Sequence, residues 1–125
     1  MIVRLTSKKQ KAERFGKRGE LFARIFLRLK FYKIMNKNYK TPFGEIDIIA
    51  KRGRAVVFVE VKARKNQNKL EEALLAVNKR RISKAANYFI AQNPFLTNND
   101  LRFDVIFLAP KSFPYHIISA FNVVE

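Results

Sequence analysis

The chain has 125 residues, 48% of them hydrophobic, with only four glycines and four prolines. This length suits one compact domain, and the apolar content is high enough to form a core, which excludes wholesale disorder. The absence of cysteine excludes disulfides, thiolate metal sites and thiol nucleophiles, and the one histidine, His116, excludes metal sites that need two. We therefore expect a single domain over residues 1–125.

Positive charge dominates the chain: 26 Lys and Arg residues against 10 Asp and Glu give a formal net charge of +16. Such a surplus favours a polyanionic partner. Nucleic acid is the first candidate, although anionic lipid or a ribosomal surface would fit almost as well. No apolar run approaches the ~20 residues of a membrane span, and residues 1–20 lack the apolar stretch of a secretory signal. We expect a soluble, cytoplasmic protein.

Apolar residues from about Lys8 to Leu29 recur at intervals of three and four, which predicts an amphipathic helix. The next segment, Lys30 to Thr41, mixes aromatic residues and Ile with lysines and is typical of an edge strand. Thr41 to Gly44 predicts a turn. Two apolar runs follow, Glu45 to Ala50 and Ala55 to Ala63, and the short basic connection between them predicts an antiparallel hairpin.

After a polar loop at residues 65–68, a second helical stripe runs from Leu70 to Phe89 and ends at Asn93-Pro94. The opposite side of this helix carries four basic residues: Lys79, Arg80, Arg81 and Lys84. Phe103 to Ala109 and Tyr115 to Val123 predict two more strands. The order helix, three strands, helix, two strands predicts an α/β fold, with a mixed sheet of about five strands flanked by helices.

Both strands of the central hairpin are apolar on both faces, which is typical of a sheet covered on two sides. Because side chains alternate across a strand, we expect Ile46, Ile48 and Ala50 on one face. Asp47 and Ile49 then lie on the other.

Three charged residues interrupt this apolar hairpin: Asp47, Glu60 and Lys62. Glu60 and Lys62 share a face of their strand with Phe58. A register that pairs odd-numbered with even-numbered residues puts all three charged groups on one surface, and a slip by one residue would separate them. A tight turn at Arg52-Gly53 permits the first register but does not prove it.

Two carboxylates close together in a half-buried place repel each other and lose hydration, so one takes up a proton unless a cation neutralises both. Lys62 supplies part of that compensation, and a divalent metal would complete it. Magnesium takes oxygen ligands, commonly one or two carboxylates with water and substrate phosphate, and needs no histidine or cysteine. We therefore expect a metal site at Asp47 and Glu60. The alternative is a structural charge cluster at the end of the sheet.

Five short motifs stand at characteristic spacings along nearly the whole chain: Arg18-Gly19-Glu20, Gly44-Glu45-Ile46-Asp47, Phe58-Val59-Glu60-Val61-Lys62-Ala63-Arg64, Lys79-Arg80-Arg81-Ile82 and Arg102-Phe103-Asp104-Val105. Together they closely resemble the YraN family. This is a group of small, mostly uncharacterised bacterial proteins related to archaeal Holliday junction resolvases and to the restriction-endonuclease-like fold. The resemblance implies a restriction-endonuclease-like core with the element order αβββαββ.

The resemblance also implies a metal-dependent endonuclease that hydrolyses phosphodiester bonds in DNA, including branched or otherwise structured DNA. Asp47, Glu60 and the carbonyl of Val61 would hold Mg²⁺ or Mn²⁺, and Glu20 would complete the metal site. The metal would polarise the scissile phosphate and lower the pKa of an attacking water, while Lys62 orients that water or stabilises charge on the phosphate. We expect five basic residues to contact the nucleic-acid backbone: Arg18, Arg64, Lys79, Arg80 and Lys84.

Other interpretations remain open from the sequence. The domain could be a basic nucleic-acid-binding module without catalysis, or an accessory protein of a ribonucleoprotein or membrane surface. DNA is favoured over RNA, and either a monomer or a homodimer is compatible with the sequence. Glu20 could form an ordinary helical ion pair with Arg24, and Glu45 could serve only to shape the turn. For Asp104 we favour a structural partner such as Arg102, and for His116 a half-exposed strand position over a proton shuttle.

Overall fold

A computed structural model describes the backbone of residues 8–124 and the side chains of residues 16–124. The chain forms three α-helices, two short 3-10 helices and five strands in these residues, in the following order: α1 (Lys8–Leu29), β1 (Lys33–Thr41), β2 (Gly44–Arg52), β3 (Ala55–Ala63), η1 (Gln67–Lys69), α2 (Leu70–Leu75), α3 (Lys79–Gln92), η2 (Pro94–Leu96), β4 (Asp100–Leu108) and β5 (Tyr115–Phe121). The α/β class and the predicted order of helix and strands are confirmed.

The five strands form one mixed sheet in sequence order, β1-β2-β3-β4-β5. The pairs β1–β2, β2–β3 and β4–β5 are antiparallel, and β3–β4 is parallel. A parallel pair needs a crossover connection, and here residues 64–99, which include α2 and α3, supply it. The mixed sheet therefore follows from the two hairpins at its ends and the helical crossover in its middle.

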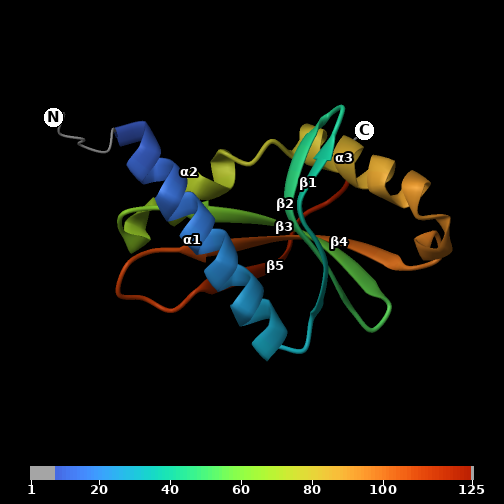
Figure 1. The fold of residues 1–125 in the computed structure, drawn as a ribbon, viewed down its shortest axis with the longest axis horizontal. Helices are drawn as coiled ribbons and strands as arrows, with labels where there is room; N and C mark the ends of the chain where they lie inside the picture. Colours follow the sequence, from blue (N-terminus) through green and yellow to red (C-terminus); the bar gives the residue numbers. More distant parts are fainter. Residues whose placement is uncertain (1–7, 125) are drawn as a thin grey trace, which may run out of the picture.

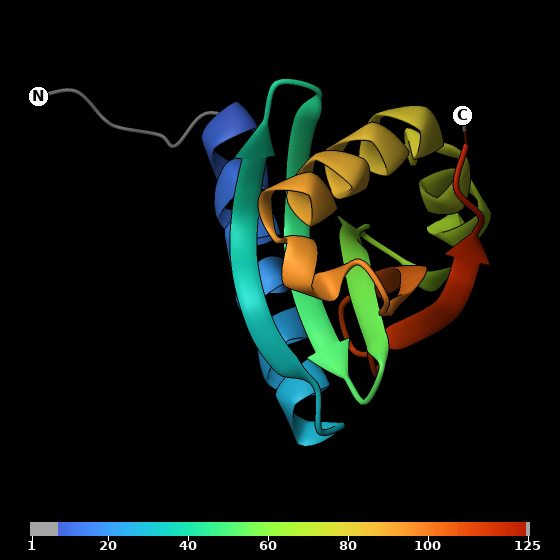
Figure 2. The ribbon, with the colours of Figure 1, turned by 90° about the vertical axis from the view of Figure 1, so that its right-hand side faces the viewer.

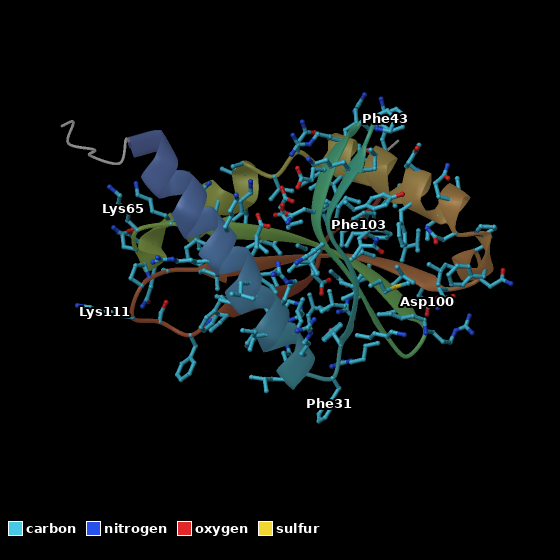
Figure 3. The ribbon with its side chains drawn as sticks, in the orientation of Figure 1. Phe31, Phe43, Lys65, Asp100, Phe103 and Lys111 are labelled. Carbon is cyan, nitrogen blue, oxygen red and sulfur yellow. The ribbon has the colours of Figure 1, made fainter. Side chains whose placement is uncertain are left out.

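Helices α1 and α3 cover opposite faces of the sheet (Figures 1 and 2). On one face, Ala23 and Leu27 of α1 pack in a cluster that includes Ile48, Val57 and Val59. On the other face, helix α3 joins a second cluster of the following buried residues, among others: Ile82, Ala85, Phe89, Ile49, Phe58 and Phe103. Phe103 lies near the middle of the molecule in Figure 3. Strands β2 and β3 are thus apolar on both faces because both faces are covered, as predicted.

The expectation that Ile46 shares a face with Ile48 is wrong. Ile46 belongs to the cluster under α3, whereas Ile48 belongs to the cluster under α1. The pairs Tyr39↔Ile46 and Lys37↔Ile48 flank Asn38, whose φ of 49° departs from the extended conformation of a regular strand. The β1–β2 hairpin therefore changes face at Asn38, and Asp47 lies on β2 between the two isoleucines.

The predicted single helix from Leu70 to Phe89 is also wrong, because Ala76–Asn78 divides it into α2 and α3. Asn78 is the N-cap of α3, and its Oδ1 accepts a hydrogen bond from the Arg81 N–H at 3.1 Å. Asparagine is a preferred N-cap because its side chain satisfies one of the backbone donors that a helix leaves unpaired at its start. Asn78 therefore indicates the start of a new helix, although the apolar periodicity continues across it. Across the described part of the chain, none of the helices has the length and apolar character to cross a bilayer.

Candidate functional site

Asp47 and Glu60 come together where the β2–β3 ladder ends. The ladder extends from Arg52↔Ala55 to Ile48↔Val59, so odd-numbered residues face even-numbered ones, as the first of the two predicted registers requires. Asp47 and Glu60 come directly after the last pair, and the negative charge of Asp47 acts on the Glu60 carboxyl group. The Oδ2 atom of Asp47 accepts a hydrogen bond from the backbone N–H of Val61 at 2.8 Å. This contact holds the Asp47 carboxylate against β3.

Lys62 lies beside the carboxylate pair. Its Nζ is 3.7 Å from Oε2 of Glu60, and its side chain is 20% exposed. Glu60 itself is buried, with 6% of its surface exposed. Burial, followed by the negative charge of Asp47 and a hydrogen bond with it, raises the pKa of Glu60 to about 8, against the opposing charges of Lys62 and Arg81. The ammonium of Lys62 therefore does not keep both acids ionised at neutral pH, and Glu60 retains its proton unless a further cation binds.

Glu20 approaches the same region from α1. Burial, followed by the charges of Asp47 and Glu45, raises the pKa of Glu20 to about 7, while Arg24 and a hydrogen bond from Asn38 act in the opposite direction. Among residues 16–124, Glu20 forms no ion pair within 4.0 Å, so the Arg24 charge acts from a distance. Gly19 lets α1 come this close to the sheet, because a Cβ there would lie 3.1 Å from Cδ1 of Leu108.

Asn38 joins Glu20 to Glu45. In the amide orientation that satisfies its neighbours, its nitrogen donates to Oε1 of Glu20 at 2.6 Å and to Oε1 of Glu45 at 3.2 Å. These three residues line an open pocket of about 460 Å³ together with Gly16, Lys17 and Lys40. Glu45 is therefore part of the acidic region and does more than shape the turn. Sequence reasoning missed Asn38 because nothing in an edge strand marks it as a partner of the helix.

The donor set fits a hard divalent cation. Carboxylate oxygens are available from Asp47 and Glu60, and the Val61 carbonyl points toward β2 as its N–H does, because both groups of a strand residue point to the same neighbour. Among the described residues, no group of three or more Asp, Glu, His or Cys side chains is arranged so that it could hold a metal ion. Water and substrate oxygens would have to complete the shell, as is usual for Mg²⁺. Glu20 lies outside the immediate donor set.

Three of the five basic residues expected to contact nucleic acid lie together on α3. Lys79, Arg80 and Lys84 are exposed there. Arg80 and Lys84 line an open groove of about 280 Å³, together with Phe43, Asn78 and Arg81. Figure 3 shows Phe43 at the tip of the β1–β2 hairpin, near the start of α3. The groove is thus built between the hairpin tip and the first turns of α3.

The other two basic residues lie elsewhere. The Nε atom of Arg64 is 3.2 Å from Oε1 of Glu72 on α2, so this guanidinium already has a protein partner. Arg18 lines a separate groove of about 390 Å³ between α1 and the segment that follows β4. The structure therefore does not bring Arg18 and Arg64 together with the basic residues of α3.

A second polar cluster surrounds Asp104, which is fully buried. Its carboxylate accepts two hydrogen bonds from Arg102, at 2.9 and 2.8 Å, and one from the Ser119 backbone at 3.0 Å. Its third partner, which makes the fourth hydrogen bond, is Nε2 of His116 at 2.7 Å. Burial alone would raise the pKa of Asp104, but the hydrogen bonds from His116, Arg102 and Ser119 outweigh it and lower the pKa. The prediction of a structural partnership with Arg102 is confirmed.

His116 is partly exposed as a whole residue on β5, as expected, but only 3% of its side chain is exposed. Its Nδ1 lies 2.6 Å from Nζ of Lys30, at the end of α1. Since an ammonium only donates, Nδ1 accepts this hydrogen bond and Nε2–H donates to Asp104. The side chain of Tyr32 accepts a hydrogen bond from Arg102 beside it. This cluster joins α1, β1, β4 and β5 away from the carboxylate pair.

Comparison with known proteins gives a consistent family. Residues 19–108 match the model of the uncharacterised protein family UPF0102. A UPF0102 protein of Parvibaculum lavamentivorans is 43% identical over 111 residues, which cover 89% of this chain and 84% of the relative. A UPF0102 protein of Mesorhizobium japonicum is 41% identical over 97% of both chains, and one of Erythrobacter litoralis is 46% identical over 92% of this chain and 98% of the relative. The matched region contains Asp47, Glu60 and Lys62.

Proposed function

This chain belongs to the uncharacterised protein family UPF0102, the YraN family, and from the geometry of the site we propose its function. We propose that it is a metal-dependent endonuclease that hydrolyses phosphodiester bonds in DNA. The observation that carries the proposal is the convergence of Asp47, Glu60 and Lys62 at one end of the β2–β3 ladder. The arrangement sets two carboxylates against one ammonium, so that without a metal ion Glu60 keeps its proton up to a pKa of about 8. A divalent cation would replace that proton and leave both carboxylates ionised.

Asp47, Glu60 and the Val61 carbonyl would hold Mg²⁺ or Mn²⁺. When bound, such an ion polarises a phosphodiester and makes a neighbouring water more acidic. The Val61 N–H keeps the Asp47 carboxylate in place, so the donor set is positioned before substrate arrives. Glu20 and Glu45 add negative charge beside this set and would bind the outer water shell of the ion.

Lys62 would act on the phosphate or on the water that attacks it. Its Nζ already lies 3.7 Å from Glu60, so the ammonium is held near the position of the reacting group. Charge that develops on the phosphoryl oxygens is stabilised by a cation that needs no rearrangement. The basic residues of α3 would hold the backbone of the substrate without reading its sequence.

The decisive experiment incubates the purified protein with Mg²⁺ or Mn²⁺ and four substrates: supercoiled DNA, single-stranded DNA, a four-way junction and RNA. We expect cleavage of DNA, abolished by EDTA and by Asp47→Asn, Glu60→Gln and Lys62→Ala, with binding retained. Asp100→Asn is the control, because it removes one carboxylate charge at an exposed position at the start of β4, where Asp100 pairs with Arg54.

Unchanged cleavage in all three site variants would show that a contaminating nuclease is responsible. Binding without cleavage of any substrate would favour the alternative of a non-catalytic nucleic-acid-binding module. That alternative draws on the same basic surface, since the groove of Phe43, Arg80 and Lys84 needs no metal.

A further inference from the structure

We propose that Arg81 is a phosphate-binding residue of this site, and that Gly44 exists to hold its guanidinium beside the carboxylate pair. This inference rests on the proposed function and adds to it a specific contact with a phosphodiester of the nucleic acid. Arg81 stands in the basic run of α3, and sequence reasoning gave it no role of its own. Four separate features of the structure support the assignment.

The first feature is the contact between Arg81 and Gly44. Gly44 begins β2 with a φ of 135°, a conformation that side chains other than glycine rarely adopt. A Cβ at this position would lie 2.4 Å from Cδ and 2.7 Å from Cγ of Arg81. The aliphatic stem of Arg81 therefore lies directly across the backbone of Gly44. Any other residue there would displace the arginine.

The second feature is the way in which α3 anchors Arg81. Its backbone N–H donates to Oδ1 of the N-cap residue Asn78 at 3.1 Å. The next residue, Ile82, is buried against the sheet, together with Phe89 further along the helix. The backbone of Arg81 is thus held firmly while its side chain remains exposed. The guanidinium at the end of the side chain is therefore the part that can bind a ligand.

The third feature is that no residue between 16 and 124 is a partner of the Arg81 guanidinium. Within residues 16–124 its side chain makes no hydrogen bond within 3.5 Å and no ion pair within 4.0 Å. By contrast, Arg54 pairs with Asp100, Arg64 with Glu72 and Arg102 with Asp104. A guanidinium offers five N–H donors in a planar fork that matches two oxygens of a phosphate.

The fourth feature is the position of Arg81 between two parts of the site. Its stem lies against Gly44, three residues before Asp47 on β2, and its positive charge acts on Glu60. It also lines the groove of Phe43, Arg80 and Lys84, where the ammonium of Lys84 lies 6.0 Å from the centre of the Phe43 ring. A nucleic-acid strand that follows this groove toward Asp47 and Glu60 would pass Arg81 last. We therefore assign it the phosphate nearest to the reacting one.

The test compares Arg81→Gln and Arg81→Lys with Arg54→Gln, which removes the same charge from an exposed arginine outside the site. Cleavage kinetics with Mg²⁺ form the first measurement. We expect Arg81→Gln to lower kcat/KM by about 100-fold or more, mostly in kcat, as for the loss of one group that stabilises the transition state. Arg81→Lys keeps the charge and the stem over Gly44 but not the fork, so it restores KM and not kcat. Arg54→Gln stays at the wild-type value.

Binding of a short DNA duplex without divalent metal, followed by fluorescence anisotropy over a range of salt concentrations, is the second measurement. Loss of one phosphate contact lowers the salt slope of binding by about one unit, and we expect this for Arg81→Gln and not for Arg54→Gln. Equal behaviour of these two variants in both measurements would overturn the inference.

The binding measurement also separates the inference from the proposed function. If the wild-type protein cleaves nothing, the nuclease proposal fails, yet the difference in salt slope still decides the role of Arg81. If the wild-type protein cleaves DNA and Arg81→Gln cleaves equally well, the role of Arg81 fails and the nuclease proposal stands. Circular dichroism of each variant checks the fold, and Arg81→Lys provides the comparison in which the contact with Gly44 is kept.

Discussion

The backbone N–H of Val61 donates to Oδ2 of Asp47 at 2.8 Å, where the paired residues of β2 and β3 come to an end. A side chain thus replaces the carbonyl that a regular ladder would supply to this N–H group. The first carboxylate of the site is fixed to the strand that carries Glu60 and Lys62, so the three groups keep their relative positions without help from a loop.

This hydrogen bond can be measured with two variants that both remove the charge of Asp47. Asp47→Asn keeps an oxygen that can accept the Val61 N–H, whereas Asp47→Ala leaves that N–H without a partner. We expect Asp47→Ala to be less stable than Asp47→Asn by about 1–3 kcal/mol, the usual cost of an unsatisfied buried polar group. Urea unfolding of both variants measures the difference. Equal free energies of unfolding would mean that water satisfies the Val61 N–H equally well.

The raised pKa of Glu60 makes the stability of the metal-free protein depend on pH. The unfolded chain loses the Glu60 proton near the ordinary glutamate pKa of 4.5, while the folded protein keeps it until about pH 8. The unfolded state therefore binds fewer protons in this interval, and the free energy of unfolding decreases as pH rises through it. Glu20, with a pKa raised to about 7, adds a smaller effect of the same sign.

We expect Glu60→Gln to remove most of this decrease, on the order of a few kcal/mol between pH 5 and pH 8. Urea unfolding in EDTA at the two pH values measures it. Glu72→Gln is the control, because Glu72 is an exposed residue on α2 that pairs with Arg64 and Lys69. A pH dependence in Glu60→Gln as steep as in the wild-type protein would show that other groups are responsible.

Metal binding should oppose that decrease in stability. A divalent cation binds the deprotonated carboxylates of the folded state only, so Mg²⁺ or Ca²⁺ should raise Tm more at pH 8 than at pH 5. At 100 times its Kd, a ligand stabilises the folded state by about 2.7 kcal/mol. The double variant Asp47→Asn, Glu60→Gln should show no specific shift. An equal shift in this variant would place the metal elsewhere, and Ca²⁺ permits the measurement without reference to cleavage.

The buried cluster around Asp104 should contribute stability and not catalysis. Removing its charge in Asp104→Asn leaves Arg102 without its carboxylate partner, and breaking a buried ion pair in this way costs about 3–5 kcal/mol. Asp100→Asn, in the exposed pair with Arg54, should change the free energy of unfolding by less than about 1 kcal/mol. Unfolding by urea compares the two. Similar values would mean that the cluster is not a stabilising element.

The same cluster has its own pH dependence, opposite in sign to that of Glu60. The hydrogen bonds of Asp104 outweigh its burial and lower its pKa, so the folded state holds the carboxylate ionised where the unfolded state begins to protonate. Its stabilisation is therefore complete above the ordinary carboxyl pKa and is lost as pH falls through the lowered value. We expect the free energy of unfolding of Asp104→Asn to fall less steeply with decreasing pH, below the ordinary carboxyl pKa, than that of the wild-type protein.

The amino-acid sequence by itself determined the local elements of the chain and their pattern of burial. Apolar spacing identified the first helix and the strands, because the helical period and alternation along a strand are local properties. An odd–even register was one of two that the hairpin allowed, and only that register puts Asp47 and Glu60 on one surface. The sequence also concealed the end of α2, since the stripe of apolar residues continues through the N-cap Asn78.

Only the tertiary structure decided which distant residues complete each site. The His116 ring, 3% exposed, lies between Asp104 at Nε2 and Lys30 at Nδ1, and Lys30 is 86 residues away in the sequence. The stem of Arg81 lies across Gly44, and Glu45 joins the acidic region through Asn38. These contacts depend on how α1 and α3 pack on the two faces of the sheet. The apolar periodicity of one segment does not depend on that packing. The strands could therefore be predicted from the sequence, whereas the residues that contact them from α1 and α3 could not.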